Sequence, residues 1–189
     1  MTISQTERHL LPTLHVEPGF HPIERVRLDD DEYARAITNF VIVCTDIVLV
    51  NRASRTIYLA KRCSKPMAGW WVIGGRTRAG EDFIESARRS LKRETTLDLS
   101  THRFQFLMIA RYWWKDRKQE PTDVGCDDLV FVFAVEPDEA ELATAASHLD
   151  TKEYDRPSGL RAFGREELVR EEIHQAVLSI YDGIFSEPS

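Results

Sequence analysis

The most constraining feature of the chain is a short apolar segment that ends in two glycines and leads into an amphipathic helix. The segment WWVIGG, residues 70–75, ends in Gly74 and Gly75. Without a Cβ atom, such a backbone can approach a ligand closely or turn a carbonyl group toward a metal ion. The segment EDFIESARRSLKRET, residues 81–95, then carries apolar residues at helical spacing: Phe83, Ile84, Ala87 and Leu91. The sequence therefore predicts a strand, a ligand-approach loop and a packed helix, in that order.

The rest of the chain alternates between strand and helix patterns. Segments rich in β-branched and aromatic residues predict strands, the first two of them a hairpin, at 39–51, 55–62, 102–114, 127–136 and 159–163. Capping and apolar spacing predict helices at 28–37, 138–147 and 165–185. Strands interleaved with helices predict an α/β sandwich, although this pattern does not fix the strand order.

The length of 189 residues suits one domain of ordinary size. Residues 1–27 contain three prolines and show little periodicity, so we expect an irregular arm that packs on the domain or on a partner subunit. Residues 28–189 would form the domain itself, including the C-terminal helix.

Composition and charge exclude several classes of function. A net charge of −6 argues against a general nucleic-acid binder, because the whole-molecule field would repel phosphate. An anionic ligand would therefore need a local cluster of arginines. No apolar run is long enough to span a membrane, and the N-terminus lacks the pattern of a signal peptide. The three cysteines lack metal-ligand spacing and indicate free thiols in a reducing cytoplasm, which is the location we expect.

The helix and its approach carry a family motif. The chain resembles the Nudix box, G-x5-E-x7-R-E-U-x-E-E-x-G-U, at residues 75–97. The match retains Gly75, Glu81, Arg89, Leu91, Glu94 and Leu97. It loses two glutamates, at Ser90 and Arg93, and the glycine at Thr96. The resemblance implies a Nudix-type α/β/α sandwich, with a mixed sheet between helices, and a hydrolase.

The particular losses narrow the resemblance. GDP-mannose mannosyl hydrolases are Nudix members that also lack the first two glutamates of the helix and keep the last. An acidic-aromatic segment at 31–33 before the first strand, Asp46 within that strand, and Arg76 after the glycines also look similar to theirs. This resemblance implies a nucleoside diphosphate sugar as substrate and a homodimer as the assembly.

The reduced set of acids suits one metal ion better than several. Mg²⁺ is often bound through one or two carboxylates together with substrate phosphates, whereas attack of water on phosphorus between two metals needs more acids. The Gly75 carbonyl and Glu94 would hold one Mg²⁺. Such an ion, together with arginines, can neutralise a diphosphate leaving group while water attacks the sugar carbon. The loss of two acids therefore fits a change in which bond is cut.

The resemblance also implies roles for residues outside the helix. Arg62, Arg76 and Arg89 would hold the diphosphate, with Arg89 also counted among the catalytic residues. Asp46 would contact the sugar or the base. On the loop before the last strand, Glu153 aligns where those hydrolases carry a glutamine-histidine pair, so it would be a metal ligand or the catalytic base. Its neighbour Tyr154 is a poor base at an ordinary pKa of about 10.

Other interpretations stay open at this point. Arg89 can equally form an ion pair with Glu81 or Glu85 on its own helix face. The chain can instead be an ordinary phosphoanhydride hydrolase whose missing acids come from elsewhere, such as Glu153 and Asp127 or Asp128. A third interpretation is a catalytically silent domain that binds a nucleotide, since three box residues are lost together.

Overall fold

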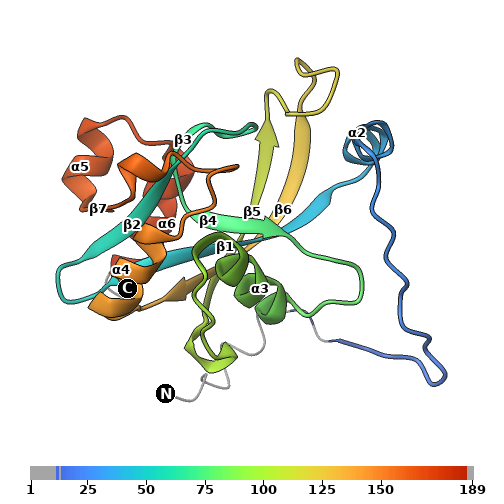
Figure 1. The fold of residues 1–189 in the computed structure, drawn as a ribbon, viewed down its shortest axis with the longest axis horizontal. Helices are drawn as coiled ribbons and strands as arrows, with labels where there is room; N and C mark the ends of the chain where they lie inside the picture. The colour runs from blue at the N-terminus through green and yellow to red at the C-terminus, as the bar shows by residue number, and fades with distance from the viewer. Residues whose placement is uncertain (1–11, 13, 187–189) are drawn as a thin grey trace.

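A seven-stranded mixed sheet forms the centre of the molecule in this computed structural model, which describes residue 12 and residues 14–186 (Figure 1). The strands are β1 (Ile42–Asn51), β2 (Thr56–Arg62), β3 (Gly69–Trp71), β4 (Ile73–Arg76), β5 (Gln105–Trp114), β6 (Cys126–Val135) and β7 (Leu160–Phe163). Their order along the main path is β3-β2-β1-β6-β5, while β4 pairs with β1 and β7 pairs with β2. Only the β1–β6 pair is parallel among these pairs, so the sheet is mixed, as the family resemblance implied.

Helices cover both faces of this sheet. The helices are α2 (Asp30–Asn39), α3 (Phe83–Thr95), α4 (Glu139–Ser147), α5 (Arg165–Arg170) and α6 (Gln175–Phe185), with short 3-10 turns at Thr101–Arg103 and Arg156–Ser158. Ala87 and Leu91 of α3 pack in one buried cluster with α4. Val177 and Ile180 of α6 pack in a second cluster on the opposite face. The predicted α/β/α sandwich is therefore confirmed.

Two predicted elements differ in detail from the structure. The predicted C-terminal helix over 165–185 is divided into α5 and α6, because the chain turns at Glu172, whose φ is 52°. The predicted strand over 70–75 is two short strands, β3 and β4, which pair with different neighbours. Residues 14–28 form no helix or strand and are exposed along their length. Within the part that the structure describes, no helix is both long enough and apolar enough to cross a membrane.

Helix α3 ends at Thr95, and the residue that caps it, Thr96, stands where the family motif has glycine. Thr96 has a φ of 65°, in the left-handed region, and its backbone N–H donates to the carbonyl of Lys92. A residue with a Cβ atom in this conformation is strained by about 1–2 kcal/mol. The helix thus retains the glycine-type ending without the glycine.

We expect Thr96→Gly to stabilise the fold by about 1 kcal/mol, because glycine adopts this conformation without strain. Urea denaturation of the variant and the parent chain would measure the change. Thr144→Gly, inside α4 with ordinary helical geometry, is the matched control and should lower stability. A fall in stability for Thr96→Gly would contradict the strain at this position.

Candidate functional site

The glycine pair of β4 lets two different groups approach the same strand from opposite sides. A Cβ atom placed on Gly74 would lie 2.3 Å from Oδ1 of Asp46, on β1. A Cβ atom placed on Gly75 would lie 2.8 Å from Oγ of Ser90 and 2.9 Å from Nη2 of Arg93, both on α3. The absence of side chains here therefore brings Asp46 and α3 close to one backbone segment, whereas the sequence had predicted the approach of a ligand or a metal ion.

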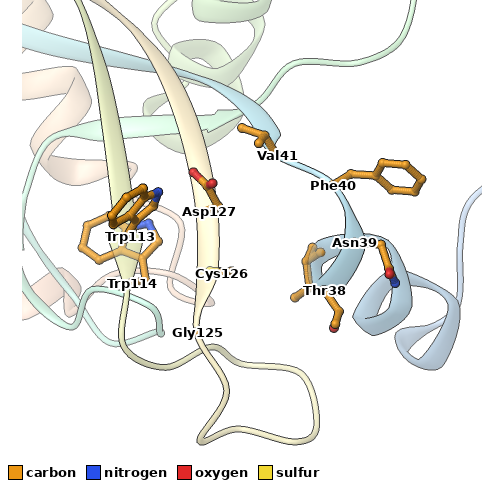
Figure 2. Close-up of a pocket in the computed structure, with 10 residues that line it drawn as sticks. Thr38, Asn39, Phe40, Val41, Trp113, Trp114, Gly125, Cys126 and Asp127 are labelled. Carbon is orange, nitrogen blue, oxygen red and sulfur yellow. The ribbon is translucent and has the colours of Figure 1, made fainter.

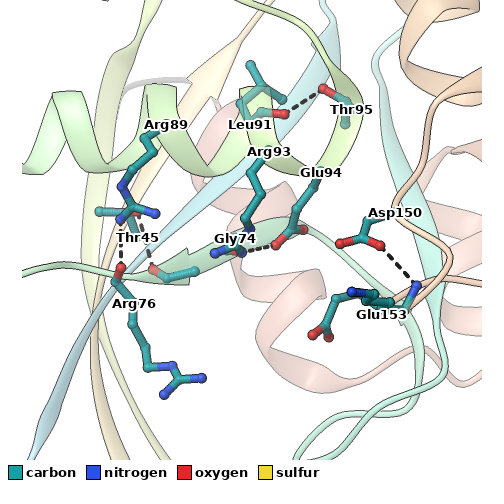
Figure 3. Close-up of polar contacts among 12 residues, drawn as sticks. Thr45, Gly74, Arg76, Arg89, Leu91, Arg93, Glu94, Thr95, Asp150 and Glu153 are labelled. Carbon is teal, nitrogen blue, oxygen red and sulfur yellow. Dashed lines mark hydrogen bonds and ion pairs between the residues drawn. The ribbon is translucent and has the colours of Figure 1, made fainter. Parts of the chain in front are cut away.

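Glu94, the retained acid of the helix, has both carboxylate oxygens engaged. Its side chain is only 3% exposed. Arg93 Nη2 donates to Oε1 (Figure 3). The hydroxyl of Tyr154 donates to Oε2. Burial raises the pKa of Glu94 above its ordinary value, against the opposing effect of Arg93 and Tyr154. Glu94 is therefore held inside the protein by two donors rather than pointing into solvent.

Arg93 connects this carboxylate to the glycine strand. Its Nη2 atom also donates to the carbonyl of Gly74, at 3.3 Å. Figure 3 shows the side chain reaching from α3 toward Gly74 and Glu94. The Arg93 side chain is 45% exposed, so part of the guanidinium still faces solvent. A positive group thus lies between a main-chain carbonyl and a buried carboxylate.

The residues expected to bind Mg²⁺ each have other hydrogen-bond partners in this structure. Glu153 does not join Glu94; its carboxylate accepts hydrogen bonds from Ser64 and from Arg62, the latter at 3.4 Å. The carbonyl of Gly75 faces the hydroxyl of Thr45 at 3.5 Å. Among residue 12 and residues 14–186, no three His, Cys, Asp or Glu side chains gather in a way that could hold a metal ion. Gly75, Glu94 and Glu153 as ligands of one Mg²⁺ therefore stay a prediction, since that set has two carboxylates and one carbonyl rather than a group of three acids.

Arg89 forms the ion pair that the sequence offered as an alternative to ligand contact. Its Nε and Nη2 atoms donate to the two carboxylate oxygens of Glu81, at 2.6 and 2.8 Å. Nη2 also donates to the carbonyl of Arg76, at 2.8 Å. Although burial acts to raise it, hydrogen bonds from Arg89 and from the N–H of Arg78 hold the pKa of Glu81 below its ordinary value. Arg89 thus fixes the loop after the glycines to α3.

Arg62 and Arg76 lie around the same group of buried acids. The guanidinium of Arg76 stacks over the ring of Tyr33 at 4.0 Å. Burial raises the pKa of Asp128 on β6, and the charges of Arg76 and Arg62 both oppose that rise. Arg62 likewise opposes the raised pKa of Glu94. The two arginines therefore supply a local positive field in a chain whose net charge is −6.

Asp46 is the most perturbed acid of this region. It is 7% exposed, and burial, with smaller contributions from Asp128 and Glu94, raises its pKa to about 7 despite the opposing charge of Arg62. Tyr112 lies nearby; burial and the Asp46 charge both raise the pKa of its hydroxyl. That hydroxyl is buried and has no hydrogen-bond partner among the described residues. Perturbed and unsatisfied polar groups of this kind are concentrated at functional sites.

The tryptophan pairs divide between the interior and the surface. Trp71 is 3% exposed and packs edge-on against Trp114 at 5.6 Å, while the Trp114 indole N–H donates to Asp128 at 2.7 Å. Trp113, by contrast, is 80% exposed. An open groove of about 380 Å³ runs past it, between the end of α2 and the tips of β5 and β6 (Figure 2). Asp127, one of the acids offered as a replacement for the lost glutamates, lines that groove, whereas Glu94, Glu153 and the predicted arginines do not.

Comparison with models of known protein families assigns this chain to a family. The family model for the NUDIX domain matches residues 42–179, which include the sheet, α3 and the start of α6. The chain belongs to the Nudix family. Comparison with curated proteins gives no match.

Solved structures agree with this family assignment at the level of the fold. The dihydroneopterin triphosphate pyrophosphohydrolase of E. coli is 12% identical, with a TM-score of 0.52 over 74% of this chain and 92% of that chain. The MutT protein of Bacillus halodurans is 15% identical, with a TM-score of 0.51 over 78% and 84%. The MutT Nudix hydrolase of Burkholderia pseudomallei is 18% identical, with a TM-score of 0.50 over 75% and 97%. These comparisons support the Nudix hydrolase family but not the narrower resemblance to GDP-mannose mannosyl hydrolases.

Sequence reasoning missed two residues of this Nudix site, Arg93 and Tyr154. In the sequence, Arg93 marks the loss of a glutamate, and Tyr154 is a poor base. The signal for Arg93 was present, because a cation at a family acid position next to Glu94 predicts an ion pair. Tyr154 gave no such signal, since it lies 60 residues from Glu94 in the sequence.

Proposed function

We propose that this Nudix protein hydrolyses a nucleoside diphosphate sugar, with water attacking the sugar carbon and the nucleoside diphosphate leaving. The observation that carries this proposal is the set of arginines around β4, in a chain whose described residues hold no group of three or more His, Cys, Asp or Glu side chains suited to a metal ion. Arginines can stabilise a diphosphate as a leaving group, whereas attack on phosphorus between metal ions needs a cluster of carboxylates.

Two of the arginines would contact the diphosphate, and the third would hold the loop after the glycines in position. Arg62 and Arg76 would bind the diphosphate oxygens, for which the planar guanidinium is well suited. Arg89 would act as a positioning residue, because its own donors are directed to Glu81 and to the Arg76 carbonyl. Asp46 would contact the ligand from the other side of the glycine pair.

Glu153 is the proposed base. Its side chain is 33% exposed, in contrast to the enclosed Glu94, and Ser64 and Arg62 hold it at the end of β2. It would accept a proton from the attacking water as the bond between the sugar carbon and the phosphate oxygen breaks. The products would be the free sugar and the nucleoside diphosphate.

The homodimer and a cytoplasmic location remain parts of the proposal, whereas the expected Mg²⁺ would meet the Arg93 guanidinium beside Glu94. Nudix hydrolases generally use divalent metals. The proposed reaction uses residues of this chain, with Arg62 and Arg76 on the leaving diphosphate and Glu153 as the base. Light scattering of the purified chain would test the homodimer.

A second candidate, nucleotide binding without turnover, is favoured by one observation. Glu94 is the one glutamate retained at the last two acid positions of the Nudix box. Its carboxylate is enclosed by Arg93 and Tyr154. A protein that only binds a nucleotide would keep Arg62 and Arg76 and would have no use for an accessible Glu94.

The deciding experiment is turnover of a panel of nucleoside diphosphate sugars in heavy-oxygen water, with Mg²⁺ or with EDTA, followed by mass spectrometry. Heavy oxygen on the released sugar would establish attack at carbon and support the proposal. Heavy oxygen on a phosphate would establish the ordinary phosphoanhydride reaction instead. If a member of the panel binds but gives no product, the result would support the second candidate, nucleotide binding without turnover.

We expect Arg62→Ala and Arg76→Ala each to lower kcat/KM about 10–100-fold, since each removes a charge-assisted contact worth roughly 1.5–3 kcal/mol. Steady-state kinetics on the best substrate of the panel would measure this loss. Arg88→Ala is the matched control, because Arg88 lies on α3 but pairs with Asp98 and Glu85 away from the glycine strand. Equal losses in all three variants would exclude a specific role for the two arginines.

A further inference from the structure

We propose that the Arg93 guanidinium is a built-in cation that takes the place of a divalent metal ion between α3 and the glycine strand. The inference concerns the same region as the proposed function but does not depend on turnover. A metal ion between α3 and the glycine strand would bind two types of oxygen. One is a main-chain carbonyl of the glycine pair, and the other is the Glu94 carboxylate. Arg93 Nη2 donates to both types, to the Gly74 carbonyl at 3.3 Å and to Glu94 Oε1.

The buried Glu94 carboxylate holds the Arg93 guanidinium in this position. Glu94 is 2% exposed, and a buried carboxylate without a cation or donors would be strongly destabilising. Burial acts to lower the pKa of Arg93, but the Glu94 carboxylate raises it above its ordinary value. Tyr154 satisfies the other carboxylate oxygen, and its loop is anchored by the N–H of Asp150 donating to the Glu94 carbonyl at 2.9 Å. Neutralisation of Glu94 is therefore complete without a metal.

The other missing acid of the helix supplies nothing to a metal. Ser90 stands at the first of the lost glutamates, and its hydroxyl is buried with no hydrogen-bond partner among the described residues. That hydroxyl lies 2.8 Å from where a Cβ atom on Gly75 would be. One acid position is therefore neutral and the other is a cation, so a divalent ion would meet one carboxylate and a positive charge beside it.

This arrangement changes what the site offers a ligand. A divalent ion would have to displace Arg93 and overcome its repulsion, and it would gain only one carboxylate from this end of the helix. The guanidinium instead presents its solvent-facing part, since the side chain is 45% exposed. The Arg93 guanidinium could then bind a phosphate group of the ligand directly, and no bound metal ion would be required.

Manganese binding without any nucleotide tests the inference. Electron paramagnetic resonance of free Mn²⁺ would be followed during titration with the parent chain, with Arg93→Glu and with Lys92→Glu. We expect Arg93→Glu to bind Mn²⁺ at least tenfold more tightly than the parent chain, because it replaces the cation by a second carboxylate next to Glu94. Lys92→Glu makes the same charge change on the same helix, where Arg88 still pairs with Asp98, and should bind no more tightly than the parent.

Two results would overturn the proposal. One is a parent chain that already binds Mn²⁺ as tightly as Arg93→Glu. The other is an equal gain in Arg93→Glu and Lys92→Glu, which would reflect net charge alone. Circular dichroism would check folding, and Arg93→Gln provides a milder variant that removes the cation and adds no acid. If Arg93→Glu does not fold, Arg93→Gln should bind Mn²⁺ more tightly than the parent, and no gain would refute the inference.

Discussion

Asp46→Asn should make the protein more stable at pH 8 by up to about 4 kcal/mol, and should have little effect at pH 4. Burial raises the pKa of Asp46 from an ordinary value of 3.8 to about 7. The folded protein therefore favours the neutral carboxylic acid. Above about pH 7 the folded chain must hold a buried carboxylate, and asparagine removes that unfavourable charge while keeping the shape of the side chain.

The direction with pH follows from proton binding. Between about pH 4 and pH 7, Asp46 binds a proton in the folded state and releases it in the unfolded state, so its ionisation lowers stability as pH rises. Urea denaturation of both proteins at several pH values would show the difference growing across this window. A constant difference would mean that the Asp46 pKa is not shifted.

Asp98→Asn is a control of opposite sign. Hydrogen bonds from Lys92 and Arg88 hold the pKa of Asp98 below its ordinary value, and this side chain is on the surface. Its ionised form therefore contributes to stability above the ordinary pKa of an aspartate, and asparagine should lower stability at neutral pH. The pair of variants separates the burial of Asp46 from any general effect of losing a negative charge.

The unfavourable burial of Asp46 also suggests why it is present. A buried acid that lowers stability at neutral pH is better explained by a role in ligand contact than by packing. Asp46→Asn would separate the effect of Asp46 on stability from its role in ligand contact. The variant should be more stable than the parent chain and should bind the ligand more weakly.

Much of the fold could be predicted because local patterns and packing agree. The apolar stripe of α3 predicts a buried face, and Ala87 and Leu91 are indeed fully buried. The hairpin of β1 and β2 follows from two β-branched segments and a short turn. The parallel pairing of β1 with β6 could not be predicted, because it joins segments about 85 residues apart and leaves no local mark in either strand.

The site could be predicted only in outline. The glycine pair, Glu94 and the arginines follow from residue types at fixed spacing, and the structure does bring α3, β1 and β4 together. The state of Glu94 could not be predicted, since it depends on Tyr154 from a distant loop and on which direction Arg93 takes. The pKa of Asp46 likewise depends on burial in the completed sheet rather than on its neighbours in sequence.

Gly74→Ala should destabilise the fold by about 3 kcal/mol, since extra volume in a close-packed site forces backbone shifts. The added Cβ atom would lie 2.3 Å from Asp46 Oδ1 and 2.8 Å from the carbonyl oxygen of Thr45. The second contact is with backbone, which cannot turn aside while Asp46 and Gly74 are partners in the β1–β4 pair. Urea denaturation would measure the loss.

Gly75→Ala is the matched control on the next residue of the same strand. Its added Cβ atom would meet only side-chain atoms, Oγ of Ser90 and Nη2 of Arg93, and the long Arg93 side chain can move. We therefore expect a smaller loss of stability, about 1 kcal/mol. Equal losses in the two variants would contradict the assignment of the clash to β1.

Asp46→Ala in combination with Gly74→Ala tests the cause of the larger loss. Truncation of Asp46 removes the contact at 2.3 Å but leaves the contact with the Thr45 carbonyl. The double variant should therefore recover part, though not all, of the stability lost in Gly74→Ala, and the two changes should not add. Strict additivity would mean that Asp46 does not press on the glycine strand. Partial recovery would show that Gly74 is required because a buried acid occupies the space where its side chain would be.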